Sequence, residues 1–440
     1  MGIINLINDL LWTYILVALL LGCAVWFTLR TRFVQFRMIK EMVRLLGDSG
    51  GKGDAKEKHI SSFQAFAISI ASRVGTGNLA GVATAIAVGG PGAVFWMWVI
   101  ALLGASSSFV ESTLAQLYKI KGKDSFIGGP AYYMRKGLKQ PWMGALFAVL
   151  ITITFGFAFN SVQSNTLCAA FEGAFGFDHA VVGGIITALT LTIIFGGVQR
   201  IAKVSSIIVP IMALGYIALA LIIVLLNIKE LPGVLALIVG HAFGWEQALG
   251  GGVGMALMQG IKRGLFSNEA GMGSTPHAHA MAKVSTPHEQ GVVAMIGVFI
   301  DTFVVLTLNS LVIISTMYTP DGVLANGYMG AVVDTIGKAN LAQTAFGTVF
   351  GESFGNIFVA ICLFFFAFST VLGWNLFGRI NANYLFGRKN KKLCNTIYTI
   401  IALMFIFLGT LTGNDFVWEL TDMFNNLIVL PNALALFALT

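Results

Sequence analysis

The stretch at residues 72–81, SRVGTGNLAG, decides the fold, because it interrupts a long apolar run with two glycines and several polar groups. Gly75 and Gly77 are two residues apart, so on a helix they face different sides and cannot form one packing seam. Irregular backbone at membrane depth is tolerated only where it faces protein, water or a ligand. We therefore interpret the stretch as a broken helix that lines a binding site. Close helix packing remains the better explanation for scattered glycines among the 51 in the chain.

The composition indicates a polytopic membrane protein. Of 440 residues, 56% are hydrophobic and 11% charged, whereas about 25% are charged in a soluble domain. The first apolar stretch, about 10–29, has no basic region before it and is long enough to span a bilayer. We interpret it as a retained transmembrane helix and not as a cleaved signal peptide. The four cysteines suggest neither a disulfide framework nor a metal site.

Basic residues between the apolar segments predict the orientation. Lysines and arginines gather in alternate loops, whereas the opposite loops carry acids, two lysines and no arginine. This positive-inside distribution predicts a multi-pass protein of the cell (plasma or inner) membrane, with its N-terminus outside and its C-terminus cytoplasmic. The net charge of +7 is thus a topology signal, and we expect the lipid bilayer as a partner, no nucleic acid and no obligatory protein partner. The predicted segments lie at about 10–29, 61–89, 93–118, 142–171, 180–198, 204–227, 246–283, 290–318, 356–378, 394–412 and 418–438.

Ten of these eleven segments divide into two halves of five. Because five is odd, consecutive five-helix units must have opposite topology, and such inverted repeats are typical of transporters with a substrate site near the bilayer midplane. In each half the first helix is interrupted by glycines. The expected domains are an N-terminal transmembrane helix with a cytoplasmic amphipathic linker (1–60), a first repeat (61–227), an extracellular connection (228–245) and an inverted second repeat (246–440).

The interrupted segment 246–283 is too long for one straight crossing. We place its break at 255–260, near the middle. The alternative is a break at 267–273, where two glycines repeat the paired spacing of the first break. Core filling explains the methionines of this helix equally well. The residues that would line a small pocket at the first of these positions are Met255, Met258 and Gln259.

A broken helix offers two kinds of backbone group. The half-helix after the break presents free N–H donors and a positive dipole end to an anion such as a carboxylate. The half-helix before it presents carbonyl oxygens, which suit a hard cation such as Na⁺. One break therefore supplies sites for the carboxylate of an amino acid and for a co-transported ion.

Two polar clusters at membrane depth can complete such a site. Gln163 can donate to a carboxylate and accept from an ammonium group, although a helix–helix hydrogen bond explains it equally well. Ser369 and Thr370 are adjacent hydroxyls that can bind Na⁺ together with carbonyls of the first break, although such a pair often bonds to its own helix. Intramembrane charges are costly and usually paired or functional. For Arg73 we expect a structural pair or an inner-gate contact with an acid. We expect Lys262 and Arg263 to face a cytoplasmic vestibule.

Two long motifs, SRVGTGNLAGVATAIAVGGPGAVFWMW (72–98) and GIKRGLFSNEAGMGS (260–274), resemble the alanine-or-glycine:cation symporter family of the amino acid–polyamine–cation superfamily. The resemblance covers nearly the whole chain. It implies an all-α membrane fold of about eleven transmembrane helices, a LeuT-type five-plus-five inverted repeat with one extra N-terminal helix. It also implies transport of alanine and glycine, coupled to Na⁺ and sometimes H⁺.

The same resemblance implies roles for particular residues. The GTGN stretch, ending at Asn78, is similar to the break of that fold's first core helix. The backbone of Gly75, Thr76 and Gly77 would receive the substrate carboxylate, Gln163 would contact the substrate, and Trp374 would form a pocket wall. The sodium ligands would be the carbonyls of Ala71 and Val74 and the hydroxyls of Ser369 and Thr370.

Other function classes fit the sequence less well. We find neither a nucleophile–base pair nor a metal-ligand set at membrane depth, so we do not expect an enzyme. No phosphate-binding loop indicates ATP-driven pumping. A uniporter or an H⁺-coupled carrier of small amino acids remains the alternative. The hydroxyl pair Ser369–Thr370 favours Na⁺ coupling, because a channel or a uniporter has no coupling ion and needs no dedicated sodium site.

Overall fold

The computed structural model describes residues 2–48, 60–122, 125–244, 253–320, 322–328, 336–387 and 390–440. These residues are almost entirely helical, apart from a short antiparallel pair of strands, β1 (Ile120–Lys121) and β2 (Phe126–Ile127). Over its described residues, each of the eleven predicted apolar segments coincides with a helix or an interrupted helix, so the all-α membrane fold is confirmed; residues 246–252 of the seventh segment lie outside the described part.

The N-terminal segment and the first group of core helices are arranged in chain order. Short π-helical turns at Leu11–Leu16, Gly77–Gly81 and Thr154–Ala158 join consecutive pieces of three of the segments. The helices are α1 (Gly2–Leu10), α2 (Val17–Arg30), α3 (Val34–Arg37), α4 (Ile39–Asp48), α5 (Ser62–Arg73), α6 (Val82–Gly89), α7 (Gly92–Leu117), α8 (Pro130–Lys136), α9 (Pro141–Ile153), α10 (Phe159–Phe175), α11 (His179–Ile194) and α12 (Gly197–Leu226).

The second group follows with one further π-helical turn, Ile300–Leu306, and a 3₁₀ turn, Lys338–Asn340. Among the described residues, seven helical runs are long and apolar enough to cross a membrane, and the interrupted segments supply shorter apolar pieces. The helices of this group are α13 (Leu231–Ala242), α14 (Val253–Asn268), α15 (Pro276–Met281), α16 (Pro287–Phe299), α17 (Thr307–Met317), α19 (Leu341–Phe350), α20 (Glu352–Phe386), α21 (Lys391–Thr410) and α22 (Asn414–Leu439).

The first helix break lies where the sequence predicts it. A capping box starts α5: the Ser61 hydroxyl accepts from the Gln64 amide at 3.1 Å, and the Gln64 side chain accepts from the Ser61 amide at 3.0 Å. The helix ends at Arg73, because Val74 leaves helical geometry with ψ 88°. The chain resumes a helical path at Gly77, so the break is only a few residues long.

The second break differs from our first placement. Helix α14 is continuous from Val253 to Asn268, so a break at 255–260 is wrong and the alternative at 267–273 is close to the observed position. Gly271 (φ +83°) and Gly273 (φ +85°) adopt left-handed backbone there, which glycine reaches without strain. Gly260 has a packing role instead, since a side chain on it would lie 2.5 Å from the Ala93 carbonyl.

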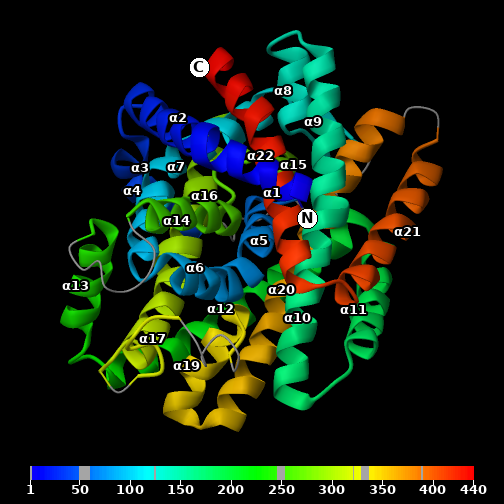
Figure 1. Cartoon of the computed structure of the whole chain (residues 1–440). Coiled ribbons are helices and arrows are strands. Elements are labelled where there is room, and N and C mark those ends of the chain that lie inside the picture. Colours follow the sequence, from blue (N-terminus) through cyan, green and yellow to red (C-terminus); the bar gives the residue numbers. More distant parts are fainter. Residues whose placement is uncertain are drawn as a thin grey trace.

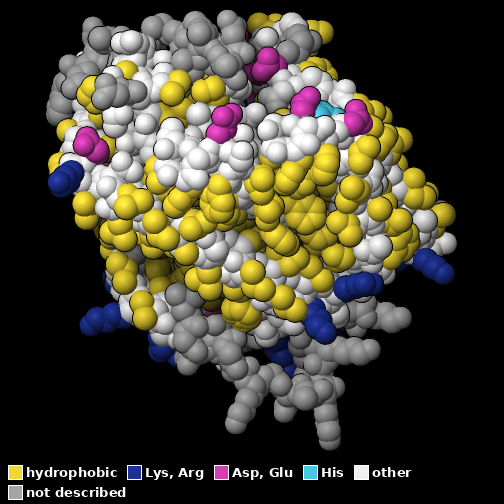
Figure 2. Space-filling view, turned by 90° about the horizontal axis from the view of Figure 1, so that it is seen from below, with side chains coloured by type: hydrophobic (Ala, Val, Ile, Leu, Met, Phe, Trp, Pro, Cys, Tyr) yellow, Lys and Arg dark blue, Asp and Glu magenta, His cyan; other side chains and the backbone are white. Residues whose placement is uncertain are grey.

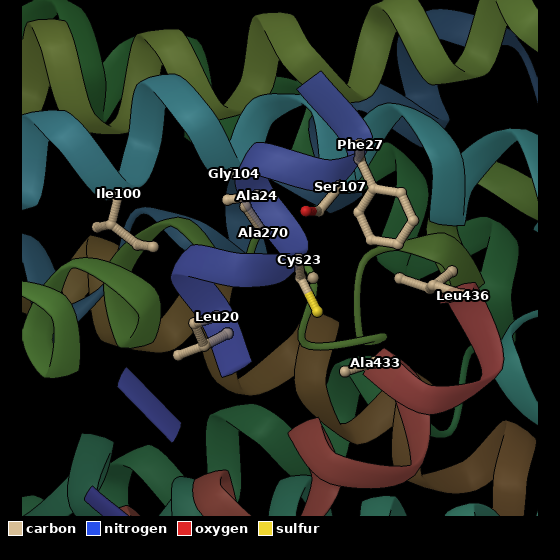
Figure 3. Close-up of a pocket in the computed structure, with 11 residues that line it drawn as sticks. Leu20, Cys23, Ala24, Phe27, Ile100, Gly104, Ser107, Ala270, Ala433 and Leu436 are labelled. Carbon is tan, nitrogen blue, oxygen red and sulfur yellow. The ribbon is translucent and has the colours of Figure 1, made fainter. Parts of the chain in front are cut away.

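Helices distant in sequence pack side by side around α20, which contacts α5, α10, α12 and α21 (Figure 1). The extra N-terminal segment, α1 and α2, lies against α22 and α7. Figure 3 shows the joint between these parts, where Cys23 and Phe27 of α2 meet Ala270 at the second break and Leu436 of α22. The remaining cavity is about 10 Å³, which is at most the size for one water. The N-terminal segment therefore seals this side of the second break.

The surface carries a hydrophobic band between two edges of opposite charge (Figure 2). Exposed acids at one edge include Glu172 and Asp178, and we call this the acidic edge. Lysine and arginine side chains gather at the opposite edge, which we call the basic edge (Figure 2). The exposed Lys391 and Lys392 lie there, because α21 runs from them to Thr410, whose carbonyl contacts His179 beside the acidic edge. Such a band is what a helical membrane protein presents to lipid.

Candidate functional site

The first break frees two carbonyl oxygens. The Gly75 amide donates to the Asn78 side chain at 3.0 Å, and the Asn78 amide donates to the Gly75 carbonyl at 3.3 Å. In a continuous helix these amides would bond the carbonyls of Ala71 and Val74. The two carbonyls are thus left for another partner, and both are buried.

Thr370 on α20 approaches those carbonyls. Its hydroxyl oxygen lies 2.7 Å from the Ala71 carbonyl, 3.2 Å from the Val74 carbonyl and 2.8 Å from the Phe366 carbonyl of its own helix. A hydroxyl donates only one hydrogen bond, so four oxygens converge here around one proton. Such an oxygen-rich cluster suits a hard cation.

Ser369 points elsewhere than its neighbour. Its hydroxyl bonds the Phe366 carbonyl at 3.0 Å and contacts the Met212 sulfur of α12 at 3.6 Å. The structure therefore brings Thr370, Ala71 and Val74 together and leaves Ser369 on the side facing α12.

Gln163 lies directly over the first break. Its side-chain oxygen accepts from the Thr76 amide at 3.2 Å. Its side-chain nitrogen is buried and has no hydrogen-bond partner among the described residues. The Thr76 hydroxyl is likewise buried without a partner. A buried polar atom without a partner costs about 1–3 kcal/mol, so this pair is suited to receiving a ligand. The absence of a side chain at Gly75 keeps this space open, because a side-chain carbon there would lie 2.6 Å from the Thr370 hydroxyl and 3.1 Å from the Gln163 nitrogen.

An aromatic wall adjoins the break. Trp374 packs against Phe159 (ring centroids 4.9 Å apart) and Phe266 (6.0 Å). A side-chain carbon at Gly77 would lie 3.1 Å from the Phe266 ring. The space beside the break is therefore narrow.

Asp301 lies beside the first break, and the sequence analysis left it outside the candidate site. Its buried carboxylate accepts from the Asn78 side chain at 2.7 Å, the Ser267 hydroxyl at 3.0 Å and the Thr302 hydroxyl at 3.1 Å. No lysine or arginine of the described residues forms an ion pair with it. The sequence does contain an indication of such a role, because an isolated acid in an apolar helix is costly and is usually paired or functional.

A second carboxylate links the two breaks. Glu269 accepts from the Trp374 indole at 2.6 Å, from the Ser274 hydroxyl at 2.6 Å and from the Ser72 hydroxyl at 3.2 Å. Ser72 lies just before the first break and Ser274 just after the glycines of the second. One carboxylate therefore joins both breaks to α20.

The glycines of the second break hold a carboxylate of the protein itself. The amides of Gly271 and Gly273 donate to the two oxygens of Glu111 on α7, at 3.1 and 3.0 Å, and Asn432 donates at 3.1 Å. Successive amides in such a curve form an anion-binding concavity. This one is filled by an internal anion.

The predicted lining from α14 lies apart from the first break. Gln259 contacts Gly89 at the far end of α6 and its amide approaches the Met255 sulfur at 3.9 Å. Met258 packs on the edge of the core. Gly89 is twelve residues beyond Gly77, about 18 Å along a helix, so the structure does not place Met255, Met258 and Gln259 beside Gln163 and Thr370.

The intramembrane cations also differ from expectation. Arg73 contacts neutral oxygens: the Ala294 carbonyl (3.0 Å) and the hydroxyls of Ser108 (3.0 Å) and Thr275 (3.1 Å). The expected acidic partner of Arg73 is therefore wrong.

Lys262 and Arg263 lie on α14 before the second break, where both are buried and neither faces a vestibule. Both pair with Asp422 of α22, at 2.6 and 3.0 Å. Arg263 also stacks on Trp418, with 4.6 Å from its guanidinium carbon to the ring centre. The expectation differed from the structure because it assumed a break at 255–260, whereas α14 continues to Asn268 and carries both cations within its helical part.

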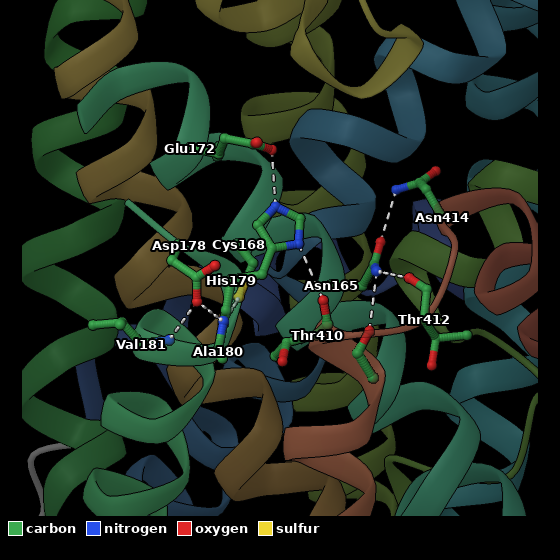
Figure 4. A network of polar contacts seen from close by, with 12 residues as sticks. Asn165, Cys168, Glu172, Asp178, His179, Ala180, Val181, Thr410, Thr412 and Asn414 are labelled. Atoms are coloured by element: carbon green, nitrogen blue, oxygen red, sulfur yellow. Dashed lines mark hydrogen bonds and ion pairs between the residues drawn. The ribbon is translucent and has the colours of Figure 1, made fainter. Parts of the chain in front are cut away.

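Polar contacts at the acidic edge tie α10 to its neighbours (Figure 4). The His179 ring lies between Glu172 (2.9 Å) and the Thr410 carbonyl (3.1 Å). Asn165 donates to the Thr412 carbonyl at 2.7 Å, and Asp178 caps α11 through the Ala180 amide at 2.8 Å. These contacts hold the helix that carries Gln163.

Comparison with known proteins shows the family. The sodium:alanine symporter family model matches residues 1–440. The chain is 49% identical over its whole length to the probable sodium/glutamine symporter GlnT of Bacillus subtilis, covering 88% of that protein. It is 46% identical to the amino-acid carrier protein AlsT of Bacillus subtilis (100% of this chain, 90% of the relative). It is 36% identical to the sodium/alanine symporter AgcS of Methanococcus maripaludis (100% and 94%).

Solved structures show the fold. MhsT in complex with L-phenylalanine superposes with a TM-score of 0.63 at 16% identity, over 87% of this chain and 89% of that one. The Eremococcus coleocola manganese transporter superposes with a TM-score of 0.53 at 13% identity, over 84% and 75%. The fold is thus of the LeuT type. The chain belongs to the sodium:alanine symporter family, whose members couple amino acid transport to sodium.

Proposed function

We propose that this protein is a secondary active symporter that carries alanine and glycine into the cell together with Na⁺ by alternating access. One observation carries the proposal: the oxygen cluster around Thr370 lies beside the unpaired amide nitrogen of Gln163, and both face the same helix break. An ion site and a carboxylate site that share one break are positioned to fill together, which is the requirement for coupling.

The substrate would replace contacts that the break now makes with itself. Its carboxylate would accept from the Gln163 amide and from the Thr76 amide, which Gln163 now occupies at 3.2 Å. Its side chain would meet Trp374 and Phe266, whose close packing favours a methyl group or hydrogen. Glutamine is a second candidate substrate, because the GlnT relative carries that name at 49% identity.

The coupling ion would be held by the carbonyls of Ala71 and Val74 and the Thr370 hydroxyl. Asp301 keeps proton coupling open as an alternative, because a buried carboxylate without a basic contact must bind a proton or a cation to be neutral. In the proposed arrangement the repeats span 61–227 and 246–440, and the basic edge is cytoplasmic, with the N-terminus outside.

Uptake by proteoliposomes tests the proposal. We would measure radiolabelled alanine with and without an inward Na⁺ gradient, with glycine, glutamine and leucine as competitors. Accumulation above equilibrium that needs Na⁺, is blocked by glycine and resists leucine is the expected result. Equilibration that does not depend on Na⁺ would show a uniporter or proton coupling. Inhibition of alanine uptake by glutamine but not by glycine would show that glutamine and not glycine is a substrate.

A further inference from the structure

A cavity of about 360 Å³ lies at the basic edge, apart from the site at the helix breaks. It is bounded by the β1–β2 hairpin, the start of α12, the end of α15, the last turns of α20 and the start of α21. Its volume is within the usual range of small-molecule sites. Of the described residues that line it, two are basic and none is acidic: Arg379 and Lys391.

Arg379 is the dominant charge of this cavity. Among the described residues, the only hydrogen bond of its side chain is a long one, 3.4 Å from a guanidinium nitrogen to the Ile194 carbonyl, and no carboxylate of these residues pairs with it. A guanidinium has five N–H donors arranged to bind a carboxylate in a fork. Most of these donors therefore remain available to an anion in the cavity.

Asn383 adds an acceptor on the same face of α20. It follows Arg379 by four residues, so the two side chains are neighbours on the helix surface. Its amide nitrogen donates to the Arg379 carbonyl at 2.8 Å and to the Asn395 side chain. Its side-chain oxygen is buried without a partner. An unpaired acceptor beside a guanidinium whose donors are mostly free matches a molecule that carries an ammonium group next to a carboxylate.

The cavity shares helix α20 with the proposed substrate site, although no residue of that site lines it. Thr370, Trp374 and Arg379 follow one another along α20, and five residues of helix span about 7.5 Å. Met281, which lines the cavity, ends α15, the half-helix that follows the second break. A substrate that leaves the breaks toward the basic edge would meet Arg379 next.

We propose that this cavity is a second amino acid site on the release path, in which Arg379 binds the substrate carboxylate and the Asn383 side-chain oxygen accepts from its ammonium group. The inference rests on the proposed function. The site would hold the zwitterion briefly after it leaves the breaks, and it would hold any small neutral amino acid, because the ligand groups recognise only the α-carbon substituents.

The test compares the two faces of the membrane. Half-saturating concentrations of radiolabelled alanine are measured in right-side-out vesicles, which expose the outer face, and in inverted vesicles, which expose the cytoplasmic face. Arg379→Gln is expected to raise the half-saturating alanine concentration about tenfold in inverted vesicles and less than twofold in right-side-out vesicles. Asn383→Ala is expected to act in the same direction more weakly, and Arg379→Lys to lie between Gln and the parent. Lys392→Gln removes an exposed charge from the same edge outside the cavity and is the matched control.

Separate outcomes overturn the inference and the proposed function. Equal values for parent and Arg379→Gln in inverted vesicles would overturn the second site while Na⁺-driven uptake by the parent continues. Absence of Na⁺-driven alanine uptake by the parent would overturn the proposed function itself. An inorganic anion or an anionic lipid headgroup shares the carboxylate's chemistry. If the Arg379→Gln effect disappears when chloride and phosphate are replaced by gluconate, or in vesicles without anionic lipid, the site belongs to that ligand and not to the substrate.

Discussion

At the scale of single residues, unpaired atoms mark the site more clearly than residue types do. Gln163 and Thr76 both bury a polar atom without a partner, within the same break. Ser369 and Thr370 are adjacent hydroxyls, yet only Thr370 reaches the freed carbonyls. Their neighbouring positions on α20 point them about 100° apart, since the helix has 3.6 residues per turn.

Thr370→Ala removes one oxygen from the cluster at Ala71 and Val74. We expect the half-saturating Na⁺ concentration to rise about tenfold, which corresponds to about 1.4 kcal/mol, with little change in alanine affinity at saturating Na⁺. Thr370→Ser should retain Na⁺ activation. Ser369→Ala is the control and should behave as the parent. Unchanged Na⁺ activation in Thr370→Ala would remove this residue from the ion site.

Asp301→Asn separates the two coupling ions. The substitution keeps the size of the side chain and removes the charge and the proton-binding group. If Na⁺ alone drives transport at the Thr370 cluster, uptake in the variant should still need Na⁺. We therefore expect alanine uptake with a higher KM and retained Na⁺ dependence, because Asn78 loses its charged acceptor. Uptake by the parent driven by a pH gradient alone, and lost in the variant, would establish proton coupling instead.

At the scale of elements, the second break depends on left-handed glycines. Gly273 has φ +85°, and a side-chain carbon on it would lie 2.9 Å from Asn432, Phe147 and Pro130. Gly271 has φ +83°, but its nearest atom would be 3.4 Å away. The left-handed backbone therefore disfavours a side chain at both positions, whereas neighbouring atoms exclude a side chain only at Gly273.

Gly273→Ala should lower stability more than Gly271→Ala. The left-handed backbone costs a residue with a side chain about 1–2 kcal/mol, and overpacking at Gly273 adds about 1–3 kcal/mol. Thermal unfolding in detergent measures the difference. Gly184→Ala in α11, with open space around it, is the control and should leave the melting temperature unchanged or raised. Equal losses at 271 and 273 would show that the close contacts do not matter.

At the scale of the whole molecule, buried charges join helices that are far apart in sequence. Asp422 of α22 binds both Lys262 and Arg263 of α14, and its side chain is fully buried. Glu269 joins both breaks to α20. In the proposed alternating-access cycle these contacts link parts that move relative to one another, so we expect their loss to affect both stability and transport.

Asp422→Asn leaves Lys262 and Arg263 buried without a counter-charge. Breaking a buried ion pair from one side costs about 3–5 kcal/mol, so we expect a large loss of thermal stability in detergent. Asp415→Asn, at the exposed start of the same helix, should change it little. A variant at 422 as stable as the one at 415 would mean that water reaches this cluster and solvates the cations.

The sequence by itself determined the membrane class, the eleven apolar segments, the family and the first break. Spans follow from hydrophobic length, and a glycine-interrupted stretch such as GTGN is a local signal. The sequence analysis also named Ala71, Val74, Gln163 and Thr370, which lie together at this break in the structure. The orientation of the termini stays a prediction.

Only the tertiary structure decided the rest. Glycine clusters at 250–260 and 271–273 look alike in sequence, but the described part of the first, from Val253 on, is helical, with Gly260 packed on α7. The amides of Gly271 and Gly273 in the second cluster instead donate to Glu111. The roles of Asp301 and Glu269 and the cavity at Arg379 depend likewise on partners from other helices. The physical reason is that a buried polar atom is costly or useful according to what lies within about 3 Å of it, and those neighbours come from segments up to hundreds of residues away.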